Sequence, residues 1–155
     1  MDLKPIGRLR TPFTTLKDCP RNGRQLQPAP DCTVEIDPAY EPGLASLDGF
    51  THLILLYWLG PQPGDLTITP AFDGKPPFVG EARGVFATRA PLRPNPIGLS
   101  VVSLHSIAPG RLTVRNLDCL DNTPLLDIKP YLPSTDSEPA AAMGWLAPHR
   151  TKAPA

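Results

Sequence analysis

Twenty-two prolines spread along 155 residues constrain this chain more than any other feature. Each proline fixes its own φ near −65° and lacks a backbone N–H, so it disrupts the interior of an α-helix. The count is nearly three times what average usage of about 5% would give. Together with 12 glycines, the prolines leave few windows for an uninterrupted helix. Short elements separated by turns are therefore expected.

Apolar and polar residues alternate over short stretches of the chain. These stretches cover residues 4–9, 33–36, 52–59, 66–69, 84–87, 99–107, 111–117 and 125–131. Many short alternating runs bounded by turn residues indicate an all-β sandwich or barrel. One short helix is expected over residues 40–47, ended by Asp48-Gly49.

The segment 84–100 alternates stiff backbone with side chains that can bind ligands. Arg93 and Asn95 each precede a proline, which restricts them to extended backbone. Side chains two apart in an extended run lie on one face, so these two are expected to point the same way. Little freedom would then be lost on binding, which favours a preorganised ligand site. A proline-rich turn leading into a strand explains the same pattern.

A second segment, 117–133, combines a turn with a strand that carries polar chemistry. Residues 121–124 read Asp-Asn-Thr-Pro, which are the residue types of a tight turn. Alternation in the following strand places Leu126 and Ile128 on one face. The other face receives Asp127, Lys129 and Tyr131. An acid, an amine and a phenol in a row form either a catalytic face or a solvated face with a salt bridge.

Taken together, these segments resemble the TsaA-like tRNA methyltransferases, also called TrmO, which transfer a methyl group from S-adenosylmethionine to tRNA. The matching parts appear in family order as Ile6-Gly7 and residues 20–25, 47–53, 84–100 and 118–133. The resemblance implies a single-domain antiparallel β-barrel over residues 1–135 with few short helices, followed by a loosely structured tail over residues 136–155. It also implies a homodimer with the cofactor near the subunit contact. Longer relatives carry a C-terminal extension, so this chain is expected to be a short form.

The cofactor assignment depends on that resemblance, because the chain has neither a G-x-G-x-x-G turn nor a P-loop. By position in the family motifs, the cofactor-binding residues are expected to be Arg24, Gln25, Leu59, Gly60, Arg89, Leu99, Leu120, Asp121, Asn122 and Thr123. The Pro-Arg-Gln motif is interrupted in this chain, so either Arg21 or Arg24 matches its arginine. Asn122 stands where the family has glycine, which is tolerable because asparagine also visits positive φ.

The resemblance also implies an acceptor, the N6 atom of threonylcarbamoyl-adenosine at tRNA position 37. Asp127 is the candidate base, and Lys129 or Arg93 would pair with the threonyl carboxylate. Tyr131 or Asn95 would hold the nucleobase by hydrogen bonds. Two alternatives stay open: a non-catalytic RNA-binding β-barrel, and an S-adenosylmethionine-dependent methyltransferase acting on a small molecule.

Charge and cysteine content add weaker constraints. The formal net charge is zero, but residues 1–25 hold six Lys or Arg and residues 83–117 hold five Arg with no acid. If the fold joins these stretches, they form a cationic surface for phosphates, with the acidic stretch 31–48 turned away. Ordinary charge scatter is the alternative. Three cysteines without CxxC spacing indicate neither a disulfide framework nor a metal site, and they suit the cytoplasm. No apolar run is long enough to span a bilayer, so no membrane association is expected.

Overall fold

The structure is a computed structural model that describes residues 2–60, 66–69 and 81–149. The chain divides into two compact units. The first contains Met1–Gly64 and Pro91–Tyr131, and the second contains Asp65–Ala90 and Leu132–Ala155. No helix among the described residues is long and apolar enough to cross a membrane.

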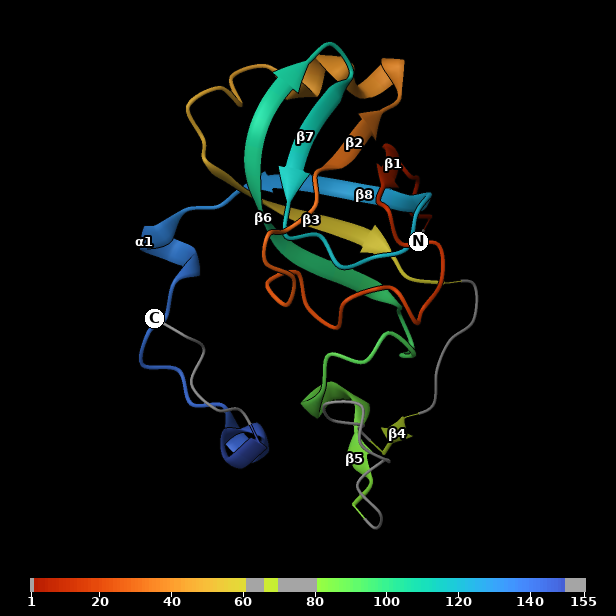
Figure 1. Ribbon diagram of the computed structural model, residues 1–155, viewed down its shortest axis with the longest axis vertical. Coiled ribbons are helices and arrows are strands. Elements are labelled where there is room, and N and C mark those ends of the chain that lie inside the picture. Colours follow the sequence, from red (N-terminus) through yellow and green to blue (C-terminus); the bar gives the residue numbers. More distant parts are fainter. Residues whose placement is uncertain (1, 61–65, 70–80, 150–155) are drawn as a thin grey trace. The chain divides into compact units, whose positions relative to one another are not determined.

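The first unit is a closed barrel of six antiparallel strands (Figure 1). The strands are β1 (Gly7–Arg10), β2 (Cys32–Ile36), β3 (His52–Trp58), β6 (Ile97–Ala108), β7 (Arg111–Arg115) and β8 (Thr123–Pro130). Around the barrel they follow the order β1-β2-β7-β6-β3-β8, and β8 pairs with β1 to close it. The expected all-β antiparallel barrel is confirmed.

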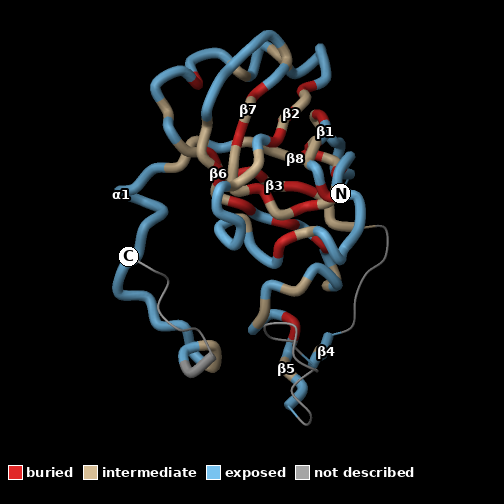
Figure 2. The backbone as a smooth tube through the Cα atoms, in the orientation of Figure 1, coloured by how far each residue is buried: buried red, intermediate tan, exposed pale blue. Residues whose placement is uncertain are grey.

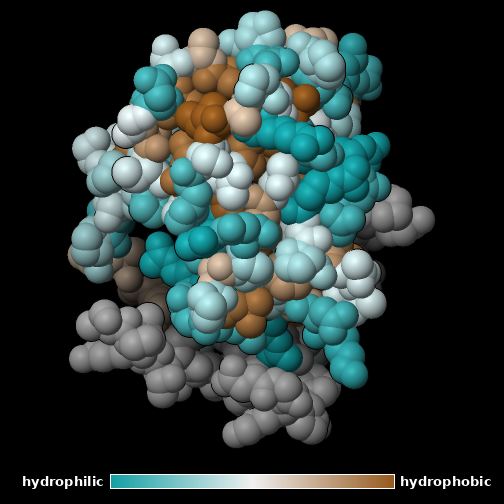
Figure 3. Space-filling model, turned by 45° about the horizontal axis from the view of Figure 1, so that its top comes forward, coloured by the Kyte–Doolittle hydropathy of each residue, from teal (hydrophilic) through white to brown (hydrophobic). Residues whose placement is uncertain are grey.

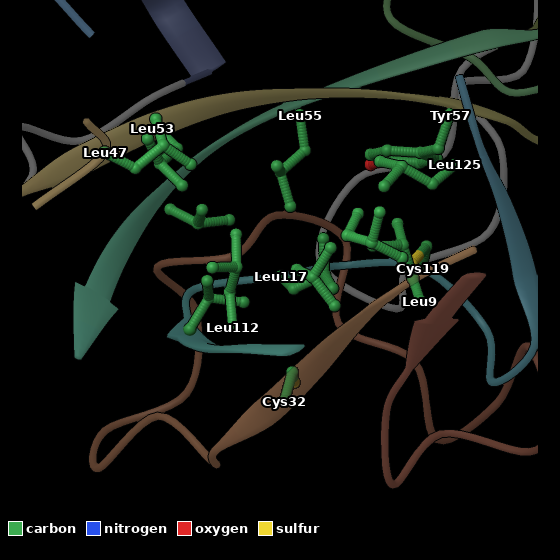
Figure 4. Packing of buried hydrophobic residues seen from close by; sticks show 14 residues of the cluster. Leu9, Cys32, Leu47, Leu53, Leu55, Tyr57, Leu112, Leu117, Cys119 and Leu125 are labelled. Atoms are coloured by element: carbon green, nitrogen blue, oxygen red, sulfur yellow. The ribbon is translucent and has the colours of Figure 1, made fainter. Parts of the chain in front are cut away.

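Alternation along the strands fills the interior with apolar side chains. In β3 the buried residues are Leu53, Leu55 and Tyr57, whereas their neighbours are half-exposed. Buried positions follow the barrel strands in Figure 2, and Figure 4 shows the side chains from different strands meeting in one core. Burying each such leucine stabilises the fold by about 1.5–3 kcal/mol. The barrel interior is therefore a packed core, and a ligand must bind outside it.

Gly98 lets an aromatic ring cross from β3 to β6. Gly98 is the register partner of Tyr57, and a Cβ on Gly98 would overlap the Tyr57 ring. The Tyr57 hydroxyl lies 2.8 Å from Ser100 Oγ and donates to Asp118 Oδ1 at 3.1 Å. The Ser100 hydroxyl also donates to Asp118. Burial raises the pKa of Tyr57, so this phenol stays protonated and links the core to the segment after β7.

Two expected elements differ in the structure. The helix expected over residues 40–47 is the 3-10 helix η1 (Pro38–Leu44), because Pro42 inside it lacks the N–H that an α-helix needs. The strand expected over residues 84–87 is wrong. The strand β5 (Arg83–Gly84) ends there, and the 3-10 helix η2 (Val85–Ala87) follows.

The second unit is small and contains short elements. Strand β4 (Thr67–Ile68) pairs with β5, and the backbone N–H of Val85 donates to the Leu66 carbonyl at 2.8 Å. The helix α1 (Pro133–Asp136) and the 3-10 helix η3 (Gly144–His149) come from the end of the chain. The Trp145 indole N–H donates to the Ala87 carbonyl at 2.8 Å, so part of the expected loose tail is ordered against this unit. Residues 150–155 of that tail lie outside the described residues.

Candidate functional site

One outer face of the barrel is apolar. It is formed by β6 and β3, which lie side by side, and β8 follows on the other edge of β3. Ile97 and Leu99 of β6 are 39% and 43% exposed. Residues that alternate with the buried ones on β3 and β6 complete what we call the outer apolar face: Ile54, Leu56, Trp58, Ile97, Leu99 and Val101.

Two of the expected site residues, Leu99 and Asp127, lie on either side of Leu56. Leu56 pairs with Leu99 on one side and with Asp127 on the other. Neighbouring strands lie about 4.8 Å apart, so the Cα atoms of Leu99 and Asp127 are roughly 10 Å apart across Leu56. The expected cofactor contact and the expected base are thus placed on one surface, separated by one strand.

A β-bulge sets the face on which Asp127 lies. Tyr57 pairs with Leu125, and the preceding residue Leu56 pairs with Asp127, so Leu126 is the extra residue. Simple alternation placed Leu126 and Ile128 on one face; with the bulge, Leu125 is fully buried, Leu126 is half-buried and Ile128 packs against the core.

Asp127 and Lys129 share the outer face and form an ion pair. Lys129 Nζ lies 2.7 Å from Asp127 Oδ2, and the two side chains are 59% and 43% exposed. The hydrogen bond and charge of Asp127 raise the pKa of Lys129. Asp127 Oδ1 accepts a hydrogen bond from the Ile128 backbone N–H at 2.9 Å. The salt bridge that one interpretation of this face expected is present, and the acid is partly exposed, so the catalytic interpretation stays a prediction.

Tyr131 lies further along the same edge. Its backbone N–H donates to the His52 carbonyl at 3.1 Å, and its ring centroid lies 6.3 Å from the His52 imidazole. Four residues of extended chain span about 13 Å, so Tyr131 is well separated from Asp127 along β8. The structure therefore does not gather Asp127, Lys129 and Tyr131 at one point.

Most expected cofactor residues come from one end of the barrel. Strand β3 ends where β6 and β8 begin, as the pairs Trp58–Ile97 and Tyr57–Leu125 show (Figure 1). The Leu59 N–H donates to the Pro96 carbonyl at 2.7 Å, which holds residues 59–60 beside residues 95–96. No described atom outside its chain neighbours lies within 4 Å of where a Cβ on Gly60 would be, so a ligand can approach the Gly60 backbone.

The turn over residues 120–123 is tied to the end of β1. The Asp121 N–H donates to the Phe13 carbonyl at 2.7 Å, and Asp121 Oδ1 accepts the Thr11 N–H at 3.1 Å. The Thr123 hydroxyl donates to the Leu120 carbonyl at 2.7 Å. Asn122 has φ 64°, which confirms that asparagine takes the left-handed conformation expected at this position.

The proline segment before β6 bends rather than running straight. Residues 93–95 form bends, and the Ile97 N–H donates to the Asn95 carbonyl at 2.7 Å across Pro96. The expected extended run is therefore wrong, because a proline between a carbonyl and an N–H two residues apart suits a γ-turn. Arg93 is half-buried and Asn95 is exposed, so the two side chains differ in environment.

The loop that carries Arg24 and Gln25 packs on the segment after β7. A Cβ on Gly23 would overlap the Asn116 carbonyl, so only glycine allows this approach. Gln25 Oε1 accepts the Arg21 N–H at 2.8 Å, and Asn22 Oδ1 accepts the Arg24 N–H at 3.1 Å. Both arginines are exposed, so the choice between Arg21 and Arg24 stays open.

Arg89 belongs to the second unit and is exposed. It follows η2 and Thr88, whose hydroxyl donates to the Val85 carbonyl at 2.8 Å. The sequence offered residues 143–146, which include Trp145, only as an apolar anchor for the tail, and it indicated neither the hydrogen bond of Trp145 to this segment nor the Tyr57–Ser100–Asp118 network. Neither has a local pattern, because both join segments far apart in the chain.

Arginines gather on the outer face of β1 and β7, opposite in character to the outer apolar face. We call Arg8, Arg10, Arg111 and Arg115 the arginine face. Figure 3 shows hydrophilic side chains on the side of the molecule where β1 and β2 lie. Arginines from both basic stretches thus lie on the two strands that flank β2.

The acidic stretch, however, is not turned away from this face. Glu35 of β2 lies 2.8 Å from Arg10 and 3.6 Å from Arg111, and Asp31 lies 2.5 Å from Arg115. Strand β2 pairs with both β1 and β7, so its outward acid lies between their arginines. Arg8 donates to the backbone and side-chain oxygens of Asn122.

Within the described part of the chain, no three His, Cys, Asp or Glu side chains are grouped to hold a metal ion. All three cysteines are free thiols. Burial raises the pKa of Cys32 to about 11 and also raises the pKa of Cys119, so neither buried thiol is a reactive nucleophile near neutral pH.

The fold and the candidate site together define a small β-barrel protein whose expected ligand-binding residues lie outside the packed barrel interior. Residues 8–137 match the profile of the tRNA-methyltransferase O N-terminal domain. The chain belongs to the TrmO family of S-adenosylmethionine-dependent methyltransferases, so the resemblance stated from the sequence is confirmed.

Similar proteins agree with this assignment. A protein of Rhizobium radiobacter named "Probable S-adenosyl-L-methionine-binding protein VirR" is 44% identical over 126 residues, which are 81% of this chain and 67% of the relative. A "tRNA (adenine(37)-N6)-methyltransferase" of Eikenella corrodens is 51% identical over 78 residues, 47% of this chain and 44% of the relative. The crystal structure of TrmO from Pseudomonas aeruginosa superposes with a TM-score of 0.72 and 36% identity.

That TrmO match covers 94% of this chain and 62% of the TrmO chain. The chain therefore spans about two thirds or less of the length of these relatives. At the level of the family, the expected cofactor is confirmed, because the relatives carry names that specify S-adenosylmethionine.

Proposed function

We propose that this protein methylates N6 of threonylcarbamoyl-adenosine at position 37 of tRNA, using S-adenosylmethionine as methyl donor. The observation that carries the proposal is the row Leu99–Leu56–Asp127, which puts an expected cofactor contact and a carboxylate on one accessible surface. The Eikenella corrodens relative, whose name specifies adenine 37 and N6, supports the choice of acceptor.

The residues present fit such a cofactor. Exposed Leu99 offers apolar surface, and among the described residues no atom beyond its chain neighbours crowds Gly60. The turn over residues 120–123 adds polar groups at the same end of the barrel. When bound, S-adenosylmethionine supplies an activated methyl group on a sulfonium. Alignment of donor and acceptor by such a site contributes several kcal/mol, with an upper range of about 7–11 kcal/mol.

Asp127 and Lys129 have different proposed roles at the acceptor: Asp127 accepts the N6 proton, and Lys129 binds the threonyl carboxylate. The N6 atom is a poor nucleophile, because its lone pair is delocalised into the ring and the carbonyl, so removal of its proton helps. In the free protein Lys129 forms an ion pair with Asp127. The threonyl carboxylate would draw Lys129 away, which frees the Asp127 carboxylate to accept the N6 proton. Arg93 and Asn95 are further candidates for holding the acceptor.

The arginine face is the proposed contact for tRNA phosphates. Arg10, Arg111 and Arg115 already have carboxylate partners, whereas Arg8 donates to neutral oxygens of Asn122. Phosphates would compete for these guanidinium groups, and such binding weakens as salt rises. A tRNA substrate would place the enzyme in the cytoplasm.

The outer apolar face is the proposed homodimer contact. An apolar patch on adjacent strands marks an interaction surface, and burial of Ile97 and Leu99 in a second copy would remove that apolar surface from water. Because Leu99 is also an expected cofactor contact, the cofactor would then lie near the subunit contact.

The experiment has two arms, binding of S-adenosylmethionine by calorimetry and methyl transfer to tRNA. The transfer arm compares tRNA with the threonylcarbamoyl group and the same tRNA without it, and nucleoside mass spectrometry locates the methyl group. Cofactor binding with transfer only to the modified tRNA supports the proposal. Cofactor binding without transfer to either tRNA favours a small-molecule acceptor. Binding of RNA without cofactor binding favours a non-catalytic barrel.

A further inference from the structure

Trp145 joins the end of the chain to the segment that precedes Arg89. Its indole N–H donates to the Ala87 carbonyl at 2.8 Å. The Arg83 guanidinium lies 5.1 Å from the centroid of the Trp145 ring, within range of a cation–π interaction. Arg83 also forms an ion pair with Glu81. Trp145 therefore contacts both ends of the short segment 83–87.

Further hydrogen bonds hold the same segment and the residues that follow it. Val85 is fully buried, and its N–H donates to the Leu66 carbonyl at 2.8 Å. The Thr88 hydroxyl donates to the Val85 carbonyl at 2.8 Å and accepts the Ala90 N–H at 3.3 Å. Hydrogen bonds thus hold the backbone immediately before and after Arg89.

These bonds constrain the backbone from which the Arg89 side chain projects. A hydrogen bond to the Ala87 carbonyl fixes the peptide plane that joins Ala87 to Thr88, since the peptide unit is planar. Thr88 is extended, with φ −136° and ψ 169°, so consecutive side chains point to opposite sides. Thr88 is half-buried and Arg89 is exposed, as this alternation requires.

We propose that Trp145 is a positioning residue for cofactor binding, because its indole N–H fixes the Ala87–Thr88 peptide plane and so orients the Arg89 guanidinium for S-adenosylmethionine. The inference depends on the proposed function, which assigns Arg89 to the cofactor. Nothing in the family motifs assigns a role to Trp145. A guanidinium that is already oriented loses less freedom on binding, which strengthens affinity.

Trp145→Phe removes the N–H donor and keeps an aromatic ring for Arg83. Loss of one hydrogen bond changes affinity by about fivefold, so the Kd for S-adenosylmethionine should rise by about that factor in calorimetry. Met143→Ala is the matched control, because Met143 lies in the same segment with a half-exposed side chain. The control should keep the wild-type Kd, and far-ultraviolet circular dichroism should show the barrel intact in both variants.

A double-mutant cycle separates positioning from general support of the fold. Arg89→Ala alone should raise the Kd by more than about fivefold, as loss of a charge-assisted contact does. In the Arg89→Ala background, Trp145→Phe should have no further effect, because the residue through which it acts is gone.

The outcomes separate the assignment of Arg89 to the cofactor from the role of Trp145. If Arg89→Ala leaves the Kd unchanged, the assignment of Arg89 to the cofactor fails, and the role of Trp145 fails with it. If Arg89→Ala weakens binding but Trp145→Phe has no effect, or an equal effect in both backgrounds, only the role of Trp145 is overturned.

Discussion

Asp127 forms an ion pair on the surface of the barrel and is also the proposed base. The bulge at Leu126 turns its side chain to the outer surface, where Lys129 pairs with it at 2.7 Å. An exposed ion pair of this kind contributes little to stability, about 0–1 kcal/mol in general. The pair can therefore open for a substrate at little cost, which suits the proposed exchange of partners.

Asp127→Asn should keep the shape of the side chain and remove its ability to accept a proton. We expect single-turnover methyl transfer to threonylcarbamoyl-modified tRNA to fall at least about a hundredfold, the lower end for a general base. Affinity for S-adenosylmethionine should stay within about threefold, less than 1 kcal/mol. Near-normal transfer by this variant would exclude Asp127 as the base.

Lys129→Ala should act on the acceptor rather than on the cofactor. Because Lys129 is proposed to bind the threonyl carboxylate, we expect a higher KM for modified tRNA, with the Kd for S-adenosylmethionine unchanged. Lys17→Ala, an exposed lysine outside the strands, is the control and should leave KM unchanged. An unchanged KM in the Lys129 variant would contradict the assignment.

Among the elements, the segment before β6 depends most on proline. Pro96 is buried, its carbonyl accepts the Leu59 N–H, and a γ-turn crosses it. The prolines thus place residues 93–95 next to the end of β3 through a bend, although the sequence had indicated a straight run.

Replacing Pro94 and Pro96 by Ala should leave the barrel folded and reduce methyl transfer, because Arg93 and Asn95 lose their fixed backbone. Each change should lower stability by roughly 0.4–1 kcal/mol through the entropy of the unfolded chain. Thermal unfolding and turnover measure the two effects separately. Pro42→Ala in η1 is the control for stability alone. Wild-type turnover in the double variant would show that the two prolines contribute to stability and not to methyl transfer.

For the whole molecule, the barrel presents two contrasting surfaces. The outer apolar face lies on β6 and β3, and the arginine face lies on β1 and β7. A dimer formed through the first surface would leave the second on each subunit accessible to tRNA.

Val101→Lys tests the dimer by placing a charge in the outer apolar face. We expect a dimer for the wild type in sedimentation velocity and a monomer for the variant, because burial of an unpaired charge is unfavourable. Thr113→Lys is the matched control, since Thr113 faces outward on β7 between the arginines, and it should remain dimeric. A monomeric wild type at micromolar concentration would contradict the proposed contact.

Local sequence determined much of this protein. Prolines, glycines and period-two alternation act over a few residues, so they predicted an all-β fold and most strands without any long-range information. The family resemblance, which has glycine at position 122, indicated a position that tolerates positive φ. Only the tertiary structure decided the rest. The bulge at Leu126 depends on the partner strand β3, and Glu35 meets Arg10 and Arg111 because β2 pairs between their strands. Trp145 bonds to Ala87, 58 residues away in the chain, and no local pattern can specify a contact that forms only when distant segments pack together.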